Sequence, residues 1–317
     1  MLKSNWEEHG EFELIRDLTH VESVWEHIEA TIEQYWDRVI EAKQNKEPKG
    51  TFSLSQRVEE IVFQWFDKAI ASYDKKAKPY LKTFDLEALE EFWDDPNAFK
   101  QCLARDVPVI AGTLQQQSSE LKEWQIAFRT TAPADLLQMF INLIDFQSEW
   151  EAADRISSFL ETGDPLELEL RPLDEDEDCR IDGVIGCGIK SAVLFYRDCE
   201  HFPVRNRDGL YAFYFLTEQK AFDLPSESSE FLMVDDQGMD FRGFGMMEFN
   251  YWYEYDQYWL YAHRIYQWLS TRLSDWNIVV DDRRRFIYVN EFLKAVSKLH
   301  SEDIKTMRGH ERFGNPM

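Results

Sequence analysis

The strongest constraint on this chain is the spacing of large apolar residues in its first half. Between residues 21 and 40 they recur every three or four positions, which is the period of one buried helix face. The members of this stripe are Val21, Val24, Trp25, Ile28, Ile32, Trp36, Val39 and Ile40. Acidic residues take the opposite face, and similar stripes follow, so residues 1–160 are expected to form one helix after another.

The second half predicts more helix and a little strand. Residues 252–273 are dense in Tyr and Trp and predict a long helix in which His263 is packed. Residues 209–216 predict an amphipathic helix, and residues 222–248 predict loops with one or two short strands. Residues 166–170 alternate Leu with Glu, which is typical of a short strand or an extended segment. The expected fold class is therefore mainly α with minor β.

Charge and composition exclude several classes of protein. The chain has 60 acidic against 35 basic residues, a net charge of −25, which argues against a broadly sticky binder of nucleic acid or anionic membrane. It contains no apolar run of membrane-spanning length and no apparent secretory signal. The cysteines, at positions 102, 179, 187 and 199, are expected to be reduced thiols in a cytoplasmic protein that holds no metal. The acidic run at residues 174–178 predicts a solvated linker.

One short segment carries most of the functional information. Residues 184–196 read Val-Ile-Gly-Cys-Gly-Ile-Lys-Ser-Ala-Val-Leu-Phe-Tyr. Gly186 and Gly188 would allow a tight turn and close approach of another molecule. The helix that follows would then present its free N–H groups to a phosphate. The alternative is a plain glycine turn between two helices.

The segment resembles the helix-hairpin-helix DNA glycosylase superfamily, the relatives of endonuclease III and adenine glycosylase. The resemblance rests on Gly-x-Gly-x-Lys-Ser-Ala, on the His201-Phe-Pro-Val204 loop, and on Lys190 and Asp208 standing 18 residues apart. It is firm over residues 184–216 and weaker over 133–273. It implies two helical lobes with a helix-hairpin-helix element at residues 131–317, preceded by a helical region at 1–130 of unknown role.

The resemblance implies a protein that flips a modified or damaged base out of double-stranded DNA and excises it, without a cofactor. Asp208 would stabilise the cationic sugar or activate the nucleophile, and Lys190 would attack the sugar carbon or hold a phosphate. Gln147, at the end of an apolar helix, would fill the gap left by the extruded base. The remaining DNA contacts would come from Gly186, Gly188, Ile189, Ser191, Asn206 and Arg207.

Several alternatives stay open from the sequence. Aligned on His-Phe-Pro, the catalytic aspartate position falls on Asn206, and either Asp208 or Asn206 would then cap the next helix. The chain would alternatively be a non-catalytic acidic module for protein interaction or DNA mimicry. The aromatic candidates for base stacking, which are expected to lie mostly in the core, are Trp252, Tyr253, Tyr255, Tyr258 and Trp259.

Two further groups of residues are weaker candidates. His20 and His27 lie on one helix face with Glu26 between them, and are expected to be surface histidines rather than metal ligands. Arg283, Arg284 and Arg285 form a dense basic spot, which would contact DNA phosphates or form ion pairs within the protein.

Overall fold

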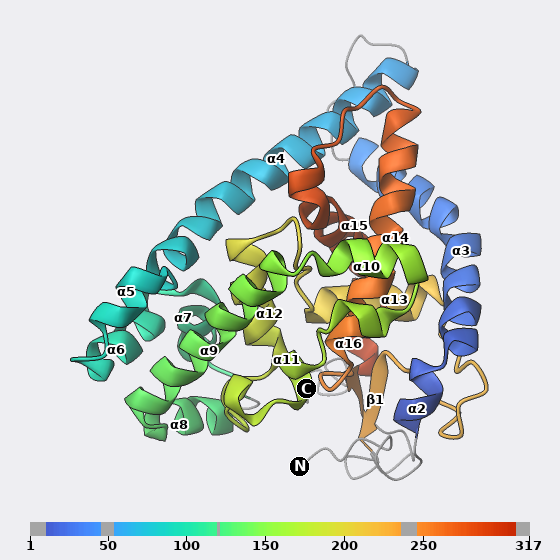
Figure 1. Ribbon diagram of the computed structural model, residues 1–317. Coiled ribbons are helices and arrows are strands. Elements are labelled where there is room, and N and C mark those ends of the chain that lie inside the picture. The colour runs from blue at the N-terminus through green and yellow to red at the C-terminus, as the bar shows by residue number, and fades with distance from the viewer. Residues whose placement is uncertain (1–10, 46–53, 119–120, 236–245, 309–317) are drawn as a thin grey trace, which may run out of the picture.

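The computed structural model describes residues 11–45, 54–118, 121–235 and 246–308, and these ranges are mainly helical (Figure 1). The helices before residue 165 are α2 (Glu11–Arg16), α3 (Leu18–Gln44), α4 (Leu54–Thr83), α5 (Leu86–Glu91), α6 (Pro96–Asp106), α7 (Pro108–Gln115), α8 (Lys122–Thr130), α9 (Pro133–Ala152) and α10 (Arg155–Thr162). The predicted helix after helix is confirmed across this part of the chain.

Short elements precede the glycine segment, and longer helices follow it. In chain order they are the 3-10 helix η1 (Pro165–Leu168), α11 (Pro172–Glu175), η2 (Glu177–Cys179), α12 (Cys187–Arg197), α13 (Arg207–Leu216), the strands β1 (Leu232–Asp235) and β2 (Met246–Phe249), α14 (Tyr255–Ser274), η4 (Asp282–Arg284), α15 (Arg285–Leu299) and α16 (Ser301–Met307). The two strands pair antiparallel, with Leu232 opposite Phe249. Mainly α with minor β is therefore confirmed.

Two long helices, α3 and α4, form two sides of a wedge around the later part of the chain (Figure 1). The fully buried Trp36 of α3 contacts Trp65 of α4 at a ring-centroid distance of 6.1 Å. It also lies 5.9 Å from Trp268 of α14 and 6.0 Å from Phe292 of α15. Such aromatic pairs stabilise beyond the area they bury. The hydrophobic core is thus continuous across the division predicted at residue 130.

Helix α13 is the centre of the molecule rather than an amphipathic surface helix, which corrects the prediction for residues 209–216. Every residue from Gly209 to Leu216 is buried, and α15, α3 and both strands pack around it. A helix that is apolar all round belongs inside a fold. Its last carbonyls are also satisfied from α3, since the Thr31 hydroxyl donates to Leu216 and the Tyr35 hydroxyl donates to Phe215.

Two local predictions need correction. The Leu-Glu alternation at residues 166–170 forms η1 instead of a strand, with Leu168 and Leu170 buried and Leu166 exposed. The acidic run at residues 174–178 is mostly exposed, as expected, but it is built into α11 and η2. Its first residue, Asp174, accepts a hydrogen bond from the backbone N–H of Tyr255. The run is therefore part of the fold and not a free linker.

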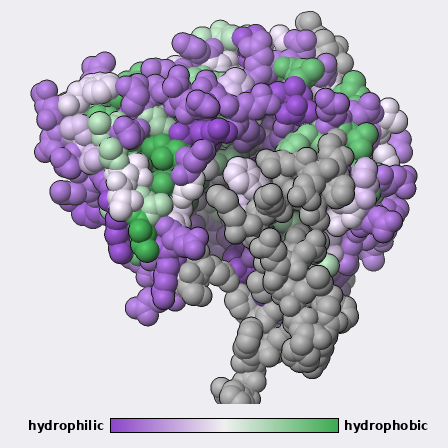
Figure 2. All heavy atoms as spheres, turned by 90° about the horizontal axis from the view of Figure 1, so that it is seen from below, coloured by the Kyte–Doolittle hydropathy of each residue, from purple (hydrophilic) through white to green (hydrophobic). Residues whose placement is uncertain are grey.

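The surface and the cysteines agree with the composition. The face shown in Figure 2 is mostly hydrophilic, with small separate apolar patches. All four cysteines are free thiols. Within the described ranges, no helix combines the length and the apolar character needed to span a bilayer.

The first prediction concerns Gly209, in the first turn of α13. A Cβ added there would collide with the hydroxyl of Tyr258, so Gly209→Ala should lower the free energy of unfolding by about 1 to 3 kcal/mol through overpacking. Gly188, in the first turn of α12, has open space around the same position, so Gly188→Ala should be neutral or stabilising. Urea denaturation of both variants measures the contrast. Equal effects would contradict the close contact, and Tyr258→Phe should partly rescue Gly209→Ala.

The second prediction concerns His263, which is 5% exposed and stacks on Trp259 at 4.9 Å. Burial, followed by the charges of Arg285 and Arg264, lowers its pKa from 6.5 to about 4. Between pH 6.5 and about pH 4 the His263 imidazole is protonated in the unfolded chain but not in the folded chain. The free energy of unfolding therefore decreases as the pH falls below 6.5. We expect wild type to lose about 2 kcal/mol more than His263→Phe between pH 7 and pH 5 in urea denaturation. Parallel pH profiles would refute this.

Candidate functional site

The glycine segment begins α12, but its two predicted turn glycines adopt ordinary conformations. Gly186 is the N-cap residue, with φ −100° and ψ 178°, and Gly188 lies in the first turn of the helix. A Cβ at either position would meet open space. The left-handed residue of the turn is Gly183, with φ +70°. Gly186 and Gly188 are both exposed, so the start of α12 is accessible from outside.

The element in front of this turn is short. It consists of α11, η2 and an isolated bridge between Ile181 and Ile185. The turn therefore has the two short elements α11 and η2 on its amino side. The longer helix α12 lies on its carboxyl side.

Lys190 and Ser191 point inward from α12, and both are buried. Lys190 is 2% exposed, and its ammonium donates to the backbone carbonyl of Leu173. The Ser191 hydroxyl donates to the carbonyl of Arg205 at 3.2 Å and accepts from the N–H of Arg205 at 3.2 Å. Ile189 is partly buried against the core. Both polar side chains therefore connect α12 to neighbouring backbone.

The start of α13 separates the two candidates for the aspartate position. Asn206 is the N-cap residue: its side-chain oxygen accepts from the Gly209 N–H at 2.9 Å, and its amide donates to Asn290 at 3.1 Å. Asp208 is not the cap. It lies half-buried in the first turn of α13, and its carboxylate makes no hydrogen bond or ion pair with the residues in the described ranges. Arg207 beside it is exposed.

The loop between α12 and α13, residues 198–206, is held from α14. The Trp259 indole N–H donates to the carbonyl of His201 at 2.8 Å. The hydroxyls of Tyr255 and Tyr258 donate to the carbonyls of Pro203 and Val204 at 2.7 and 3.0 Å. These three aromatic residues, together with Tyr253, are buried as predicted.

Trp252 is the exception among the aromatic candidates, because it is 57% exposed. It follows Tyr251, whose carbonyl accepts a 2.7 Å hydrogen bond from the guanidinium of Arg205. The same guanidinium donates to the Cys187 sulfur at 3.0 Å. Arg205 thus links the turn that carries Trp252 to the first turn of α12.

Gln147 is buried, and its side chain is used in contacts within the fold. Its side-chain oxygen accepts from Arg197 at 2.7 Å, and its amide donates to Glu151 at 2.7 Å. The Arg197 guanidinium also donates to the carbonyl of Phe84. The predicted gap-filling residue therefore serves as a bridge between α9 and α12.

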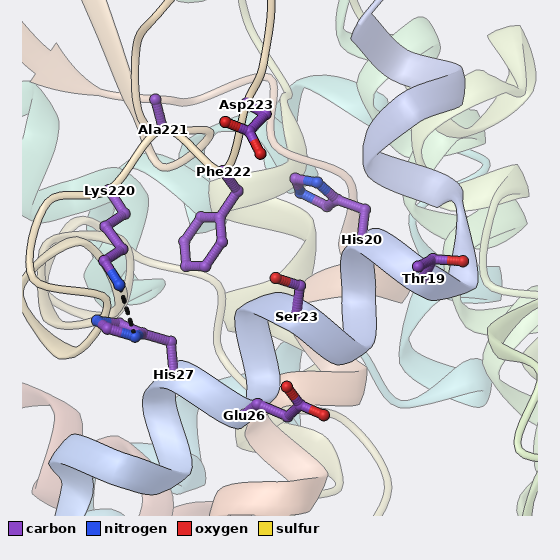
Figure 3. A pocket seen from close by; sticks show the side chains of 9 residues that line it. All are labelled: Thr19, His20, Ser23, Glu26, His27, Lys220, Ala221, Phe222 and Asp223. Atoms are coloured by element: carbon purple, nitrogen blue, oxygen red, sulfur yellow. Dashed lines mark hydrogen bonds between the residues drawn. The ribbon is translucent and has the colours of Figure 1, made fainter.

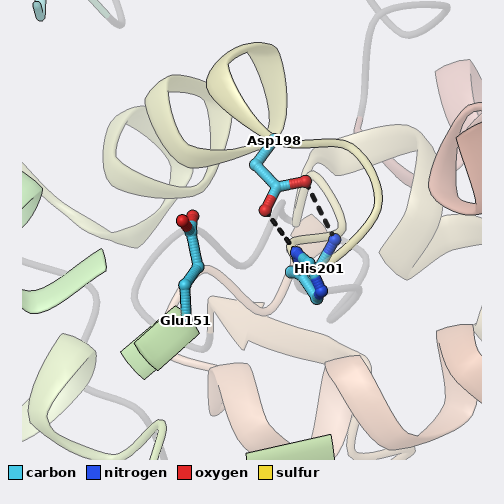
Figure 4. A group of neighbouring side chains, drawn as sticks. All are labelled: Glu151, Asp198 and His201. Carbon is cyan, nitrogen blue, oxygen red and sulfur yellow. Dashed lines mark hydrogen bonds and ion pairs between the residues drawn. The ribbon is translucent and has the colours of Figure 1, made fainter. Parts of the chain in front are cut away.

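A group of three titratable side chains lies next to Gln147: Glu151 near the end of α9, and Asp198 and His201 in the loop after α12 (Figure 4). Their nearest ligand atoms lie within 4.8 Å of one another. His201 Nδ1 is 2.5 Å from Asp198 Oδ2. Asp198 Oδ1 accepts from the N–H groups of Glu200 and His201.

The charges of this group influence one another. Burial raises the pKa of Glu151, and the nearby charge of Asp198 raises it further. Burial alone would raise the pKa of Asp198, but its hydrogen bond and charge contact with His201 outweigh this and lower it. For His201, burial would lower the pKa, whereas Asp198 raises it more, so the net direction is upward. The arrangement favours ionised Asp198 beside protonated His201.

A hollow with a volume of about 880 Å³ lies elsewhere, between α3 and the loop after α13 (Figure 3). His20 and His27 line it from α3, with the ring of Phe222 beside both imidazoles. Both histidines are partly buried and have partners: His20 pairs with Glu230, and His27 contacts Glu218 and Lys220. None of the residues predicted to bind DNA lines this hollow.

The three arginines at residues 283–285 have different surroundings. Arg284 forms an ion pair with Asp74 at 2.6 Å, and Arg285 lies 3.8 Å from Glu200. The side chain of Arg283 is exposed. Two of the three arginines therefore follow the ion-pair alternative.

Comparison of the chain with protein-family models, with curated proteins and with solved structures finds no match in any of the three.

Sequence reasoning missed the group of Glu151, Asp198 and His201. Asp198 and His201 stand at i and i+3 in one loop, a spacing that favours contact, and this signal was present in the sequence. Glu151 is 47 positions before Asp198, and only the packing of α9 against the loop brings it near.

Proposed function

We propose that the protein excises a modified base from DNA by hydrolysis, with Asp208 as the reacting carboxylate and without a lysine Schiff base. The observation that carries the proposal is the position of Asp208. Its carboxylate lies in the first turn of α13 without a described hydrogen-bond partner, whereas Asn206 is committed as the cap. A carboxylate that is not engaged in hydrogen bonds within the fold is available to stabilise a cationic sugar.

Two exposed features that Arg205 links to each other would suit an extruded nucleotide. The exposed start of α12 offers a helix N-terminus, where backbone N–H groups and the helix dipole favour a phosphate. The exposed Trp252 offers a stacking surface, which is worth about 1 to 3 kcal/mol per base in single-strand binding. Residues 180–208 hold five basic and four acidic side chains, so this region lacks the acidic excess of the whole chain.

The proposed chemistry needs only water and the chain. The bond between the sugar C1′ and the base nitrogen breaks, and the base leaves with the electron pair and takes up a proton. The ionised Asp208 stabilises the positive charge that develops on the sugar, and water adds to C1′ and releases a proton. The products are the free base and an abasic site, with no covalent enzyme intermediate.

The third prediction tests this role with Asp208→Asn. Single-turnover release of base from duplexes that each carry one modified base, such as uracil, 8-oxoguanine, hypoxanthine or 3-methyladenine, should fall about 100-fold or more. Stability should change by less than about 1 kcal/mol, because the carboxylate contributes only through the helix dipole. Asp135→Asn is the matched control: Asp135 is an exposed acid in the first turn of α9, and its loss should leave base release unchanged.

Two results would count against the proposal. The first is equal base release by wild type and Asp208→Asn. The second is no base release from any duplex, together with no duplex binding by fluorescence anisotropy at about 50 mM salt, where phosphate contacts are strongest.

The fourth prediction concerns Lys190, whose buried ammonium is bound to the Leu173 carbonyl. Borohydride should trap no adduct between the wild-type protein and substrate DNA, because a Schiff base requires the amine to reach the sugar. Lys190→Met keeps the alkyl packing and should retain base release while losing about 1 to 3 kcal/mol of stability from the unpaired carbonyl. A trapped adduct that maps to Lys190 by mass spectrometry would refute the assignment.

The second candidate is a non-catalytic acidic interaction module that keeps the hairpin. The inward orientation of Lys190 and Gln147 favours it, since both side chains are used in contacts within the fold. The two candidates separate in the assay above, because a module of this kind neither releases a base nor responds to Asp208→Asn.

A further inference from the structure

The group of Glu151, Asp198 and His201 combines the ligand types that bind divalent transition metals. One imidazole and two carboxylates converge from two segments, with their nearest ligand atoms within 4.8 Å of one another (Figure 4). In a tetrahedral site with ligands at about 2.1 Å from the ion, neighbouring ligand atoms are about 3.4 Å apart. The three ligand atoms therefore have to move closer together to enclose an ion, and the Glu151 side chain, which is exposed near the end of α9, has room to make that movement.

Apart from the His201 imidazole, which contacts Asp198, no cationic side chain of the described residues forms an ion pair with either carboxylate. Arg197 uses its guanidinium on Gln147 and on the carbonyl of Phe84. Arg285 faces Glu200 at 3.8 Å. Glu151 has a neutral donor, the amide of Gln147, at 2.7 Å. Two carboxylates brought this close repel each other unless a proton or a cation lies between them.

The loop also fixes its ligands in advance. Two backbone N–H groups hold Asp198, and the ring of Trp150 meets the His201 imidazole edge-on at a centroid distance of 5.9 Å. The backbone carbonyl of His201 is fixed by Trp259. A preorganised ligand shell of this kind loses little conformational entropy when an ion binds.

We propose that Glu151, Asp198 and His201 form a binding site for one divalent transition-metal ion of the Zn²⁺ type. The imidazole favours Zn²⁺ or Co²⁺ over Mg²⁺ or Ca²⁺, which prefer oxygen ligands alone. Three protein ligands leave a coordination position for water or an anion, as in metal sites that support chemistry. The ion takes the place of the proton between Asp198 and His201 if it binds Nδ1. The site is separate from Asp208 and does not depend on its role.

The fifth prediction is the test of this site, made on the full chain without an affinity tag. Co²⁺ titration should give visible absorption bands that saturate at one ion per chain, and Zn²⁺ should displace the Co²⁺. His201→Ala and Glu151→Gln should each weaken binding by about 10-fold to 100-fold or more. Glu200→Gln is the matched control, because it removes one negative charge from the loop that carries Asp198 and His201 without removing a ligand. The affinity of this variant for Co²⁺ should change by less than about threefold.

A measurement on the wild type keeps the test independent of variant folding. Zn²⁺ should slow the modification of His201 by diethyl pyrocarbonate, read by mass spectrometry, while the rate at His27 stays constant. The proposal fails if Co²⁺ and Zn²⁺ do not bind to the folded wild type. It also fails if His201→Ala binds Co²⁺ as tightly as the wild type does, because the ions would then be adventitious ions on other acidic residues. It fails as well if diethyl pyrocarbonate modifies His201 at the same rate with and without Zn²⁺.

Discussion

The rest of the structure depends on the hydrogen bonds from α14 to the loop between α12 and α13. Tyr255, Tyr258 and Trp259 lie at i, i+3 and i+4 on one face of α14, and their polar tips hold three carbonyls of the loop. Because these groups are buried, a lost bond would leave an unsatisfied carbonyl at a cost of about 1 to 3 kcal/mol. The loop is thereby held in one conformation, and α13 enters the core in one orientation.

The fixed loop determines where both candidate sites lie. At its end, Asn206 caps α13, while the Asp208 carboxylate makes no hydrogen bond to the residues that the structure describes. At its start, Asp198 turns back on His201 and faces Glu151 from α9. The two candidate sites thus lie at opposite ends of the same loop, but they serve separate proposals: a reacting carboxylate at Asp208 and a metal ion at the loop start.

The net charge of −25 governs contacts at the surface, whereas several basic side chains are used for hydrogen bonds within the fold. On the surface it disfavours non-specific contact with phosphates, so any DNA binding has to be local and sensitive to salt. Inside, several basic side chains hold backbone or thiol groups: Lys190 binds Leu173, Arg197 binds Phe84, and Arg205 binds Cys187 and Tyr251. Among these three, Lys190 is the residue that the sequence offered as a DNA contact, and its ammonium is used within the fold.

The sequence by itself determined the helical class, the places of several long helices and the region of the short strands, because apolar periodicity and end signals are local properties. It also indicated that Asn206 or Asp208 would cap α13. It did not determine that α13 is buried on all sides, since Tyr and Thr tips from other segments satisfy its polar ends only in the folded chain. Nor did it determine that Lys190 and Gln147 point inward, or that Glu151 meets Asp198 and His201. Those facts depend on contacts between residues far apart in the chain, and only the tertiary packing of α9, α12 and α14 decides them.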